Sequence, residues 1–229
     1  MTLTPQGLFT DKLFGLFCVQ EVIYLKNPWE DIPLSDYESH MSSENVFQLQ
    51  TLSQMMKEQF SSDKFESIMI LGIAGGNGLE HINKEQVNKV YGVDVNQSYL
   101  DECVKRYSEL NGVLETICAD LLDDGLQLPY SQLLVANLLI EYIGYSCFQR
   151  VVMNVKPKYV SCIIQINSEN SFVSDSPYLH SFDCLERVHH QMEEEALINC
   201  MREIDYRTKE IKERTLPNGK RFLRIDFVQ

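Results

Sequence analysis

Four glycines stand within the seven residues Gly72–Gly78, directly after the apolar run Ile68-Met69-Ile70-Leu71. Glycine adopts a positive φ at little cost and, because it lacks a Cβ, lets a bound molecule approach the backbone closely. A helix that began just after this turn would also present unpaired N–H groups to that molecule. A strand, a glycine-rich turn and a helix in this order are typical of nucleotide-like ligand sites in parallel sheets. The turn therefore predicts a nucleotide-like ligand.

Two aspartates follow the next two apolar runs and could accept hydrogen bonds from such a ligand. Asp94 comes directly after Tyr91-Gly92-Val93, and Asp120 comes directly after Cys118-Ala119. A carboxylate in the first position can accept from both hydroxyls of a ribose, since each hydroxyl offers an O–H donor. Each aspartate alone is also compatible with a solvated strand end or turn. The ordered set is therefore more specific than either member.

The spacing of small residues distinguishes two classes of ligand. A dinucleotide fingerprint requires G-x-G-x-x-G, and the chain from Gly76 onward lacks the third glycine. Ala74, Gly76 and Gly78 instead alternate, and this pattern resembles the S-adenosylmethionine turn of class I, Rossmann-like methyltransferases. That family usually has an acidic residue where Gly72 stands and glycine where Ala74 stands, so the sequence departs from the pattern at these positions.

The resemblance implies S-adenosylmethionine as the cofactor and gives roles to particular residues. It implies that Asp94 binds the ribose hydroxyls, that Asp120 accepts from the adenine amino group, and that the N–H of Leu121 contacts the ring. A backbone carbonyl near Gly72 would then replace the usual acid at the methionine ammonium. The predicted cofactor site consists of Gly72, Ala74, Gly75, Gly76, Gly78, Asp94, Val95, Asp120, Leu121 and Asn137.

Asn137 ends the fourth apolar run, whose carboxyl end faces the transferred methyl group in this fold. The chain continues Leu138-Leu139-Ile140 rather than with the Pro-Pro-aromatic run of nucleobase amino methyltransferases, so that specialisation is not supported. Asparagine is a poor replacement for an acidic metal ligand, and we expect no metal. Glu141 and Tyr142 either line the pocket or face solvent, and the sequence favours neither.

The candidate catalytic residues come from the segment 29–41, where aromatic, acidic and imidazole side chains follow one another. Long segments without secondary structure are often functional, and an oxygen or nitrogen acceptor can require a base. The segment resembles the one that precedes the glycine strand in uncharacterised bacterial small-molecule methyltransferases. We predict that it is a lid and that Tyr37 and His40 are its catalytic or substrate-contact residues. Packing of the lid on the domain is the competing interpretation. Residues 167–182 form a second candidate lid.

The elements that must position these residues follow from hydrophobic periodicity and turn signals. Short apolar runs alternate with amphipathic stretches from residue 65 onward, which predicts a parallel sheet covered by helices on both faces. Asn218-Gly219 predicts a hairpin at the end of the chain. The expected strands are 67–71, 89–95, 114–119, 133–137, 159–166, 203–215 and 222–228. The expected helices are 8–25, 44–60, 78–84, 97–109, 145–154 and 182–200.

The predicted fold class is α/β, a three-layer sandwich with a mostly parallel seven-stranded sheet, an antiparallel last strand and an N-terminal helical lid. We expect residues 1–62 to form the helical lid segment and residues 63–229 to form the Rossmann-like methyltransferase domain.

Composition narrows the partners and the compartment. Acidic residues number 33 against 20 basic ones, a formal charge of −13, whereas nucleic-acid binders normally present a basic face. We therefore expect a small-molecule substrate and no nucleic acid; a basic peptide substrate and a homodimer are left open. The seven cysteines include no C-x-x-C pair, which suits reduced thiols in the cytoplasm and no structural zinc. No apolar stretch is long enough for a bilayer, so we expect no membrane partner.

The leading hypothesis is an S-adenosylmethionine-dependent methyltransferase that transfers a methyl group to oxygen or nitrogen of a small molecule. One alternative is an NAD(P)-dependent oxidoreductase on a Rossmann-like sheet, although the third glycine is missing. The other is a non-catalytic member that binds S-adenosylmethionine, and the departures at Gly72 and Ala74 motivate it.

Overall fold

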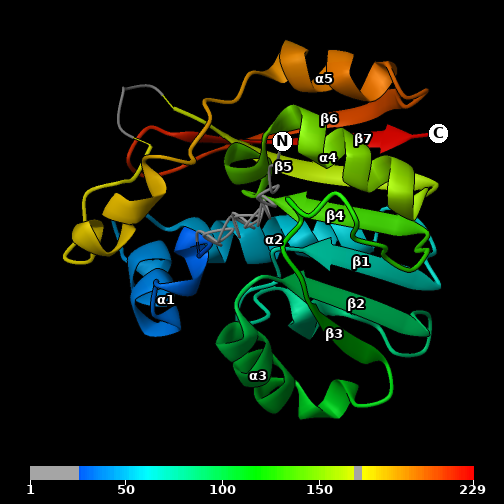
Figure 1. Cartoon of the computed structure of the whole chain (residues 1–229), viewed down its shortest axis with the longest axis horizontal. Helices are drawn as coiled ribbons and strands as arrows, with labels where there is room; N and C mark the ends of the chain where they lie inside the picture. The colour runs from blue at the N-terminus through cyan, green and yellow to red at the C-terminus, as the bar shows by residue number, and fades with distance from the viewer. Residues whose placement is uncertain (1–25, 168–171) are drawn as a thin grey trace, which may run out of the picture.

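The centre of the molecule is one seven-stranded sheet with the strand order β3-β2-β1-β4-β5-β7-β6 (Figure 1). The computed structural model describes residues 26–167 and 172–229, so the helix predicted for 8–25 lies outside the described residues. Strands β1 to β5 are parallel, and β7 is antiparallel to both β5 and β6. The predicted fold class is confirmed. The strands are β1 Ser67–Leu71, β2 Lys89–Asp94, β3 Leu114–Cys118, β4 Leu133–Asn137, β5 Tyr159–Ile166, β6 Arg207–Thr215 and β7 Arg221–Val228.

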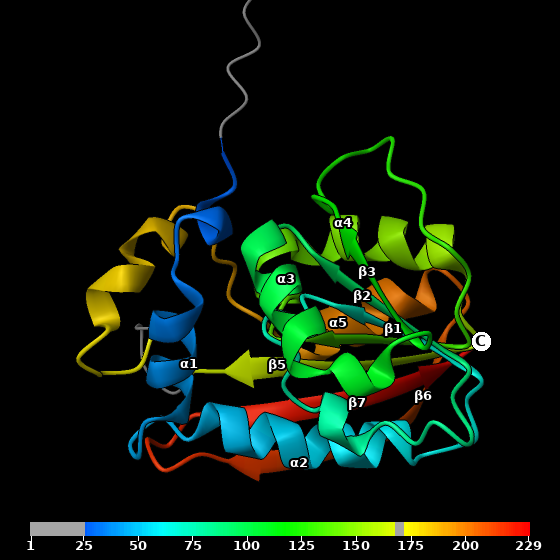
Figure 2. The ribbon, with the colours of Figure 1, turned by 90° about the horizontal axis from the view of Figure 1, so that it is seen from below.

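Helices cover both faces of the sheet because its central strands are apolar on both sides. In β1, Ile68 and Ile70 pack into a core with helices α2 (Gln48–Phe60) and α3 (Gln97–Arg106). The alternate residues Met69 and Leu71 pack into the opposite core with α4 (Ile140–Val155) and α5 (Glu194–Arg202). Figure 2 shows α2 and α4 on opposite sides of the strands. Two-sided burial of this kind is what a run of consecutive apolar residues in a parallel strand predicts.

The helix predicted for 78–84 is wrong. The chain forms only the 3-10 turn η2 (Leu79–His81) and then a turn at Asn83–Val87 before β2 begins. Helix α2 already fills the adjacent space, since a Cβ placed on Gly78 would lie 2.6 Å from Met56 Sδ. The space that a regular helix after the glycine turn would fill is therefore occupied by α2, which comes before the turn in the sequence.

The long helix predicted for 182–200 is also wrong. Its range holds the end of a 3-10 helix, η4 (Leu179–Leu185), and most of α5, with an irregular stretch between them. In that stretch two backbone N–H groups bond to α4 instead of to a helix of their own. His190 N donates to Glu141 O at 2.6 Å, and Glu193 N donates to Tyr145 Oη at 2.9 Å.

The segment predicted as an irregular lid contains regular structure, which corrects that prediction. It forms the 3-10 helix η1 (Pro28–Glu30) and the helix α1 (Leu34–Ser42), and α2 begins only at Gln48 because Phe47 has a φ of 52°. Helix α4 begins at Ile140, five residues earlier than expected, and is interrupted at Gly144, where φ is 73°.

Helix α1 and the η4 segment lie together beyond the carboxyl ends of the parallel strands, where the arrow of β5 points (Figure 2). Ile32, Phe182 and Leu185 form a small apolar core between these two segments. The predicted domain boundary at residue 62 stays a prediction, and α2, on its N-terminal side, packs directly on the sheet. Across the described ranges, no helix combines the length and apolar character needed to cross a membrane.

Candidate functional site

A cavity of about 360 Å³ opens at the carboxyl ends of β1 to β4. The strand order reverses between β1 and β4, and ligands of open parallel sheets bind where the order reverses. The wall includes Gly72 and Ala74 after β1, Asp94 at the end of β2, and Asp120 after β3. The sheet therefore places residues that are far apart in sequence around one space.

The N-terminal segment lines this cavity. Three hydrogen bonds hold it to the loops that follow β2 and β3 and to helix α3. Asn27 Nδ2 donates to Asp120 Oδ2 at 3.2 Å. Asn96 Nδ2 donates to the Trp29 carbonyl at 3.1 Å, and Tyr99 Oη donates to the Ile32 carbonyl at 2.8 Å. Residues 26–32 therefore form a docked lid.

The glycine turn presents only its first part to the cavity. Gly72 N donates to the Val93 carbonyl at 2.8 Å, and Ala74 N donates to Asp94 Oδ2 at 2.9 Å. Ala74 has a φ of 47°, which is costly for a residue with a side chain. The turn is thus folded back onto the end of β2.

The later glycines of the turn pack against the protein itself. A Cβ on Gly75 would lie 2.5 Å from Glu38 Oε1, and a Cβ on Gly76 would lie 2.6 Å from Tyr107 Cε2. Gly78 packs in the same way against α2. These three residues are outside the cavity wall, and their predicted contact with the cofactor stays a prediction.

Asp94 and Asp120 both present carboxylate groups to the cavity. Asp94 also accepts from Asn96 N at 2.9 Å; burial raises its pKa, and backbone N–H donors oppose that shift. Asp120 Oδ1 accepts from Leu122 N at 2.9 Å. Each carboxylate oxygen has two lone pairs, so one backbone bond leaves capacity for a ligand. Val95 and Leu121 also lie in the wall.

At the end of β4, the polar side chain of Asn137 is engaged by the protein itself. The amide of Asn137 pairs with that of Gln59 of α2 in both directions, at 3.0 and 2.9 Å, so its polar atoms face α2. The next residue, Leu138, lines the cavity with a φ of 53°. Ala74 and Leu138 thus place two strained non-glycine residues in one wall, and such strain clusters at functional sites.

A second cavity of about 60 Å³ adjoins the first, and we call it the inner chamber. Trp29, Tyr37, Leu138 and Tyr142 line both spaces, so they form the boundary between them. Burial, followed by the charges of Asp94 and Glu38, raises the pKa of Tyr37 well above its usual value. The Tyr37 phenol therefore stays protonated.

The structure separates the two residues predicted to be catalytic. Tyr37 lies at the boundary, whereas His40 lies in the wall of the inner chamber only. His40 Nδ1 is 2.7 Å from Ser176 Oγ, and its ring centroid is 4.6 Å from that of Phe182. Burial and then the charge of Lys220 lower the pKa of His40 to about 4. Its imidazole is therefore neutral near pH 7.

Glu141 and Tyr142, which the sequence left open between pocket and solvent, both lie in the wall of the inner chamber. Glu141 is only 3% exposed. Its Oε1 accepts from Gln165 N at 2.8 Å, and no described residue hydrogen-bonds its Oε2. Burial raises the pKa of this carboxyl to about 7, against the opposing effect of two backbone N–H donors.

Sequence reasoning missed the residues that hold the lid. Asn27 is the N-cap of η1 and forms a capping box with Glu30, which the Asn-x-x-Glu spacing could have indicated. Tyr99 lies on the buried face of α3, where its hydroxyl gave no signal of its partner. Within the described ranges, no three His, Cys, Asp or Glu side chains form a group that could hold a metal ion.

The fold is that of known S-adenosylmethionine-dependent methyltransferases. The N-methyltransferase NodS from Bradyrhizobium japonicum, solved with S-adenosyl-l-homocysteine, superposes with a TM-score of 0.61 at 12% identity, covering 86% of this chain and 97% of that one. Magnesium protoporphyrin IX methyltransferase from Synechocystis, solved with the same ligand, gives 0.59 at 7% identity, covering 85% and 93%. No family model and no curated sequence matches the chain.

The same fold also carries other chemistry. The [4+2]-cyclase SpnF superposes with a TM-score of 0.58 at 8% identity, covering 78% of this chain and 80% of that chain. At such identities the similarity establishes the fold alone, and function has to be argued from the site.

Proposed function

We propose that the protein is an S-adenosylmethionine-dependent methyltransferase that acts on oxygen or nitrogen of a small molecule. The observation that carries the proposal is the placement of Asp94 and Asp120 at the ends of β2 and β3, facing one cavity at the point of strand reversal. The glycine turn lines the same cavity through Gly72 and Ala74.

The chemistry of the wall fits the cofactor. Asp94 offers acceptors for the ribose hydroxyls, and Asp120 offers one for the adenine amino group. Apolar side chains, among them Leu121, Leu139 and Ile143, surround the rest of the space and suit an adenine ring. The bound cofactor supplies an already activated methyl group, so the protein has to position the acceptor and exclude water.

The docked lid supports the exclusion of water, and the inner chamber supports a small acceptor. We infer that the acceptor reaches the cofactor at the boundary between the two cavities, where Tyr37 lies. As a protonated phenol, Tyr37 would orient the acceptor by donating a hydrogen bond rather than by taking a proton. His40 is a proposed contact deeper in the chamber. An acidic surface and a covered cavity agree with a small acceptor, and we keep the cytoplasm as the proposed compartment.

Isothermal titration with S-adenosylhomocysteine and, separately, with NADH tests this proposal. We expect S-adenosylhomocysteine to bind in the micromolar range and NADH not to bind. Asp94→Asn should weaken S-adenosylhomocysteine at least about tenfold, because a charged acceptor for two hydroxyls is lost. Asp101→Asn, on the exposed side of α3, is the matched control. Absence of S-adenosylhomocysteine binding at millimolar concentration, or tight NADH binding, would refute the proposal.

A further inference from the structure

The wall of the inner chamber includes a buried glutamate whose carboxylate is only partly hydrogen-bonded by the residues that the structure describes. Glu141 lies on the first turn of α4, and its Oε1 is held by the backbone of β5 through Gln165 N at 2.8 Å. Its other oxygen, Oε2, is buried, and none of the described residues bonds to it. A buried acceptor of this kind is costly unless a ligand satisfies it. The position is therefore prepared for a hydrogen-bond donor.

Among the residues that the structure describes, Glu141 has no positively charged partner. No described lysine or arginine forms an ion pair with Glu141. Lys220, whose charge reaches His40 and His189, donates to the Phe172 carbonyl at 2.6 Å and is not part of the chamber wall. The chamber therefore favours a ligand group that brings its own positive charge.

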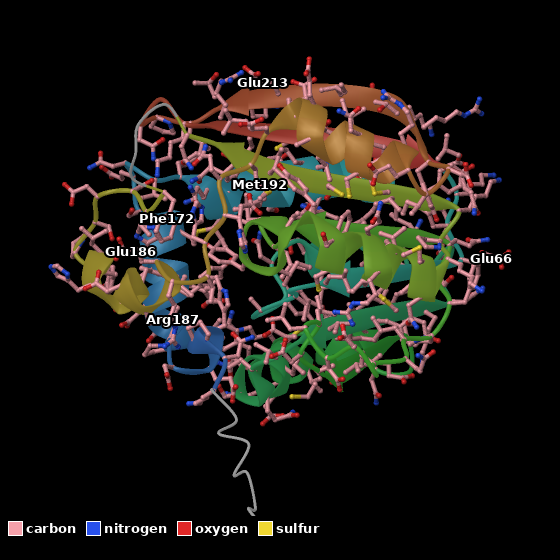
Figure 3. All side chains as sticks on the ribbon, turned by 45° about the horizontal axis from the view of Figure 1, so that its top comes forward. Glu66, Phe172, Glu186, Arg187, Met192 and Glu213 are labelled. Atoms are coloured by element: carbon pink, nitrogen blue, oxygen red, sulfur yellow. The ribbon has the colours of Figure 1, made fainter. Side chains whose placement is uncertain are left out.

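Aromatic rings form much of the remaining wall, beside the apolar side chains of Met41, Leu138 and Val173 and the paired amides of Gln48 and Gln165. The ring centroids of Trp29 and Tyr142 are 4.9 Å apart at nearly a right angle, and Phe172 stacks on His189 at 4.0 Å. Figure 3 shows Phe172 on the same side of the molecule as α1 and η4, with Glu66 at the opposite edge. Faces of aromatic rings attract cations, most strongly when the cation is shielded from water. A buried carboxylate among such rings suits an ammonium group better than a second carboxylate.

The size of the chamber limits what enters it. Its volume is about 60 Å³, against about 360 Å³ for the large cavity. An ammonium headgroup fits this space. Because Tyr37 and Tyr142 also line the large cavity, the rest of such a ligand would extend between them toward the cofactor site.

We propose that the methyl acceptor carries an ammonium group that binds in the inner chamber, with Glu141 as its counter-ion and Trp29, Tyr142 and Phe172 in the surrounding wall. The ammonium group anchors the ligand, and a separate oxygen or nitrogen with a free lone pair, on the part that extends toward the cofactor site, takes the methyl group. The inference rests on the proposed function only in treating the bound ligand as the methyl acceptor. The binding of amines by Glu141 can be tested without methyl transfer.

The test uses ligands that differ only in their headgroup. We would titrate the protein, saturated with S-adenosylhomocysteine at about pH 8, with 2-phenylethylamine, 2-phenylethanol and phenylacetate, and with butylamine, butanol and butyrate. We expect each amine to bind at least about tenfold more tightly than its alcohol and its acid. Glu141→Gln should remove this preference and leave the affinity for S-adenosylhomocysteine unchanged. Glu109→Gln, at an exposed glutamate, should keep the preference.

A second measurement on the unmodified protein does not depend on the folding of a variant. Between about pH 8 and about pH 5 the amine and Lys220 stay charged, and His40 and His189, with pKa values lowered to about 4, stay neutral. Among the groups of the chamber wall, Glu141, with a pKa of about 7, changes charge. His190, whose backbone N–H donates to the Glu141 carbonyl and whose charge reaches His189, lies outside that wall, so its contribution is present in Glu141→Gln as well and is removed by comparing the two proteins. Affinity for the amines should fall about tenfold or more over this range, while affinity for the alcohols stays constant.

The proposal is overturned if no amine binds, if alcohols or acids bind as tightly as amines, or if Glu141→Gln keeps the amine preference. The titration with S-adenosylhomocysteine alone separates the two levels of inference. If S-adenosylhomocysteine binds and the amine preference is absent, only the ammonium site fails. If amines bind through Glu141 in the absence of any S-adenosylhomocysteine binding, the methyltransferase proposal fails and the ammonium site stands.

Discussion

Replacing Glu141 by glutamine should change the pH dependence of stability in a way that no packing effect reproduces. The glutamine keeps the shape of the side chain and the acceptor for Gln165 N, and it removes the ionisable group. Burial raises the pKa of Glu141 from 4.5 to about 7. The folded state therefore holds this proton where the unfolded state has released it, and the wild-type protein loses stability as the pH rises through that window.

The size of the effect follows from the two pKa values. At about pH 5 the buried carboxyl costs the folded state about 1 kcal/mol, and at about pH 8 it costs about 3 kcal/mol. The stability of Glu141→Gln relative to wild type should therefore increase by about 2–3 kcal/mol between these pH values. All other groups titrate alike in both proteins and cancel in the comparison. Any constant cost of burying the glutamine amide cancels as well.

Urea unfolding of both proteins without ligand, at the two pH values and with matching m-values, gives this difference directly. A relative stability that changes by less than about 0.5 kcal/mol between the two pH values would mean that Glu141 titrates normally. In that case a water or a protein group solvates its carboxylate, and the reasoning behind the ammonium site is refuted.

Four further variants test other parts of the molecule. Tyr37→Phe should leave S-adenosylhomocysteine affinity unchanged and slow methyl transfer to an amine by about tenfold, as expected for one lost hydrogen bond; equal rates would exclude Tyr37. Asn27→Ala should release S-adenosylhomocysteine about fivefold faster in stopped-flow experiments, because the lid loses a bond of about 1 kcal/mol; an unchanged rate would show that this bond does not hold the lid. Arg224→Met should cost about 3–5 kcal/mol in urea unfolding, since it leaves the buried Asp226 without its cation; a neutral effect would contradict this. The pKa of His40, lowered from 6.5 to about 4, means that the folded state gains stability as the pH rises through that range, and His40→Gln should reduce this gain by about 3 kcal/mol; a parallel pH profile would contradict the burial argument.

Much of the sheet could be predicted from the sequence because each strand carries its own signal. The apolar runs at Ser67–Leu71 and Tyr159–Ile166 are buried on both faces, and Asn218-Gly219 marks the hairpin between β6 and β7. The helices are harder to predict, because their limits depend on the elements that pack against them. The stretch after Gly78 contains helix-compatible residues, but the space that a helix would fill is taken by Met56 of α2. Such a tertiary contact leaves no local pattern.

The candidate site likewise contains residues whose position the sequence predicts and residues whose role depends on tertiary contacts. Asp94 and Asp120 follow strands, so the parallel topology alone brings them to one edge of the sheet. The role of Glu141 depends on its surroundings, namely the backbone of β5 and the nearby aromatic rings. A glutamate within an apolar run of sequence does not reveal either of these neighbours. Asn137 shows the converse, since its side chain, which the strand-end position marks as a ligand contact, pairs with Gln59.

A crystal structure of the protein with S-adenosylhomocysteine tests the proposed cofactor site most directly. We predict the ribose hydroxyls on Asp94, the adenine amino group near Asp120, and the sulfur facing the boundary formed by Tyr37 and Tyr142. A ligand bound at any other place, or a cavity that stays empty in crystals soaked at millimolar concentration, would contradict this prediction.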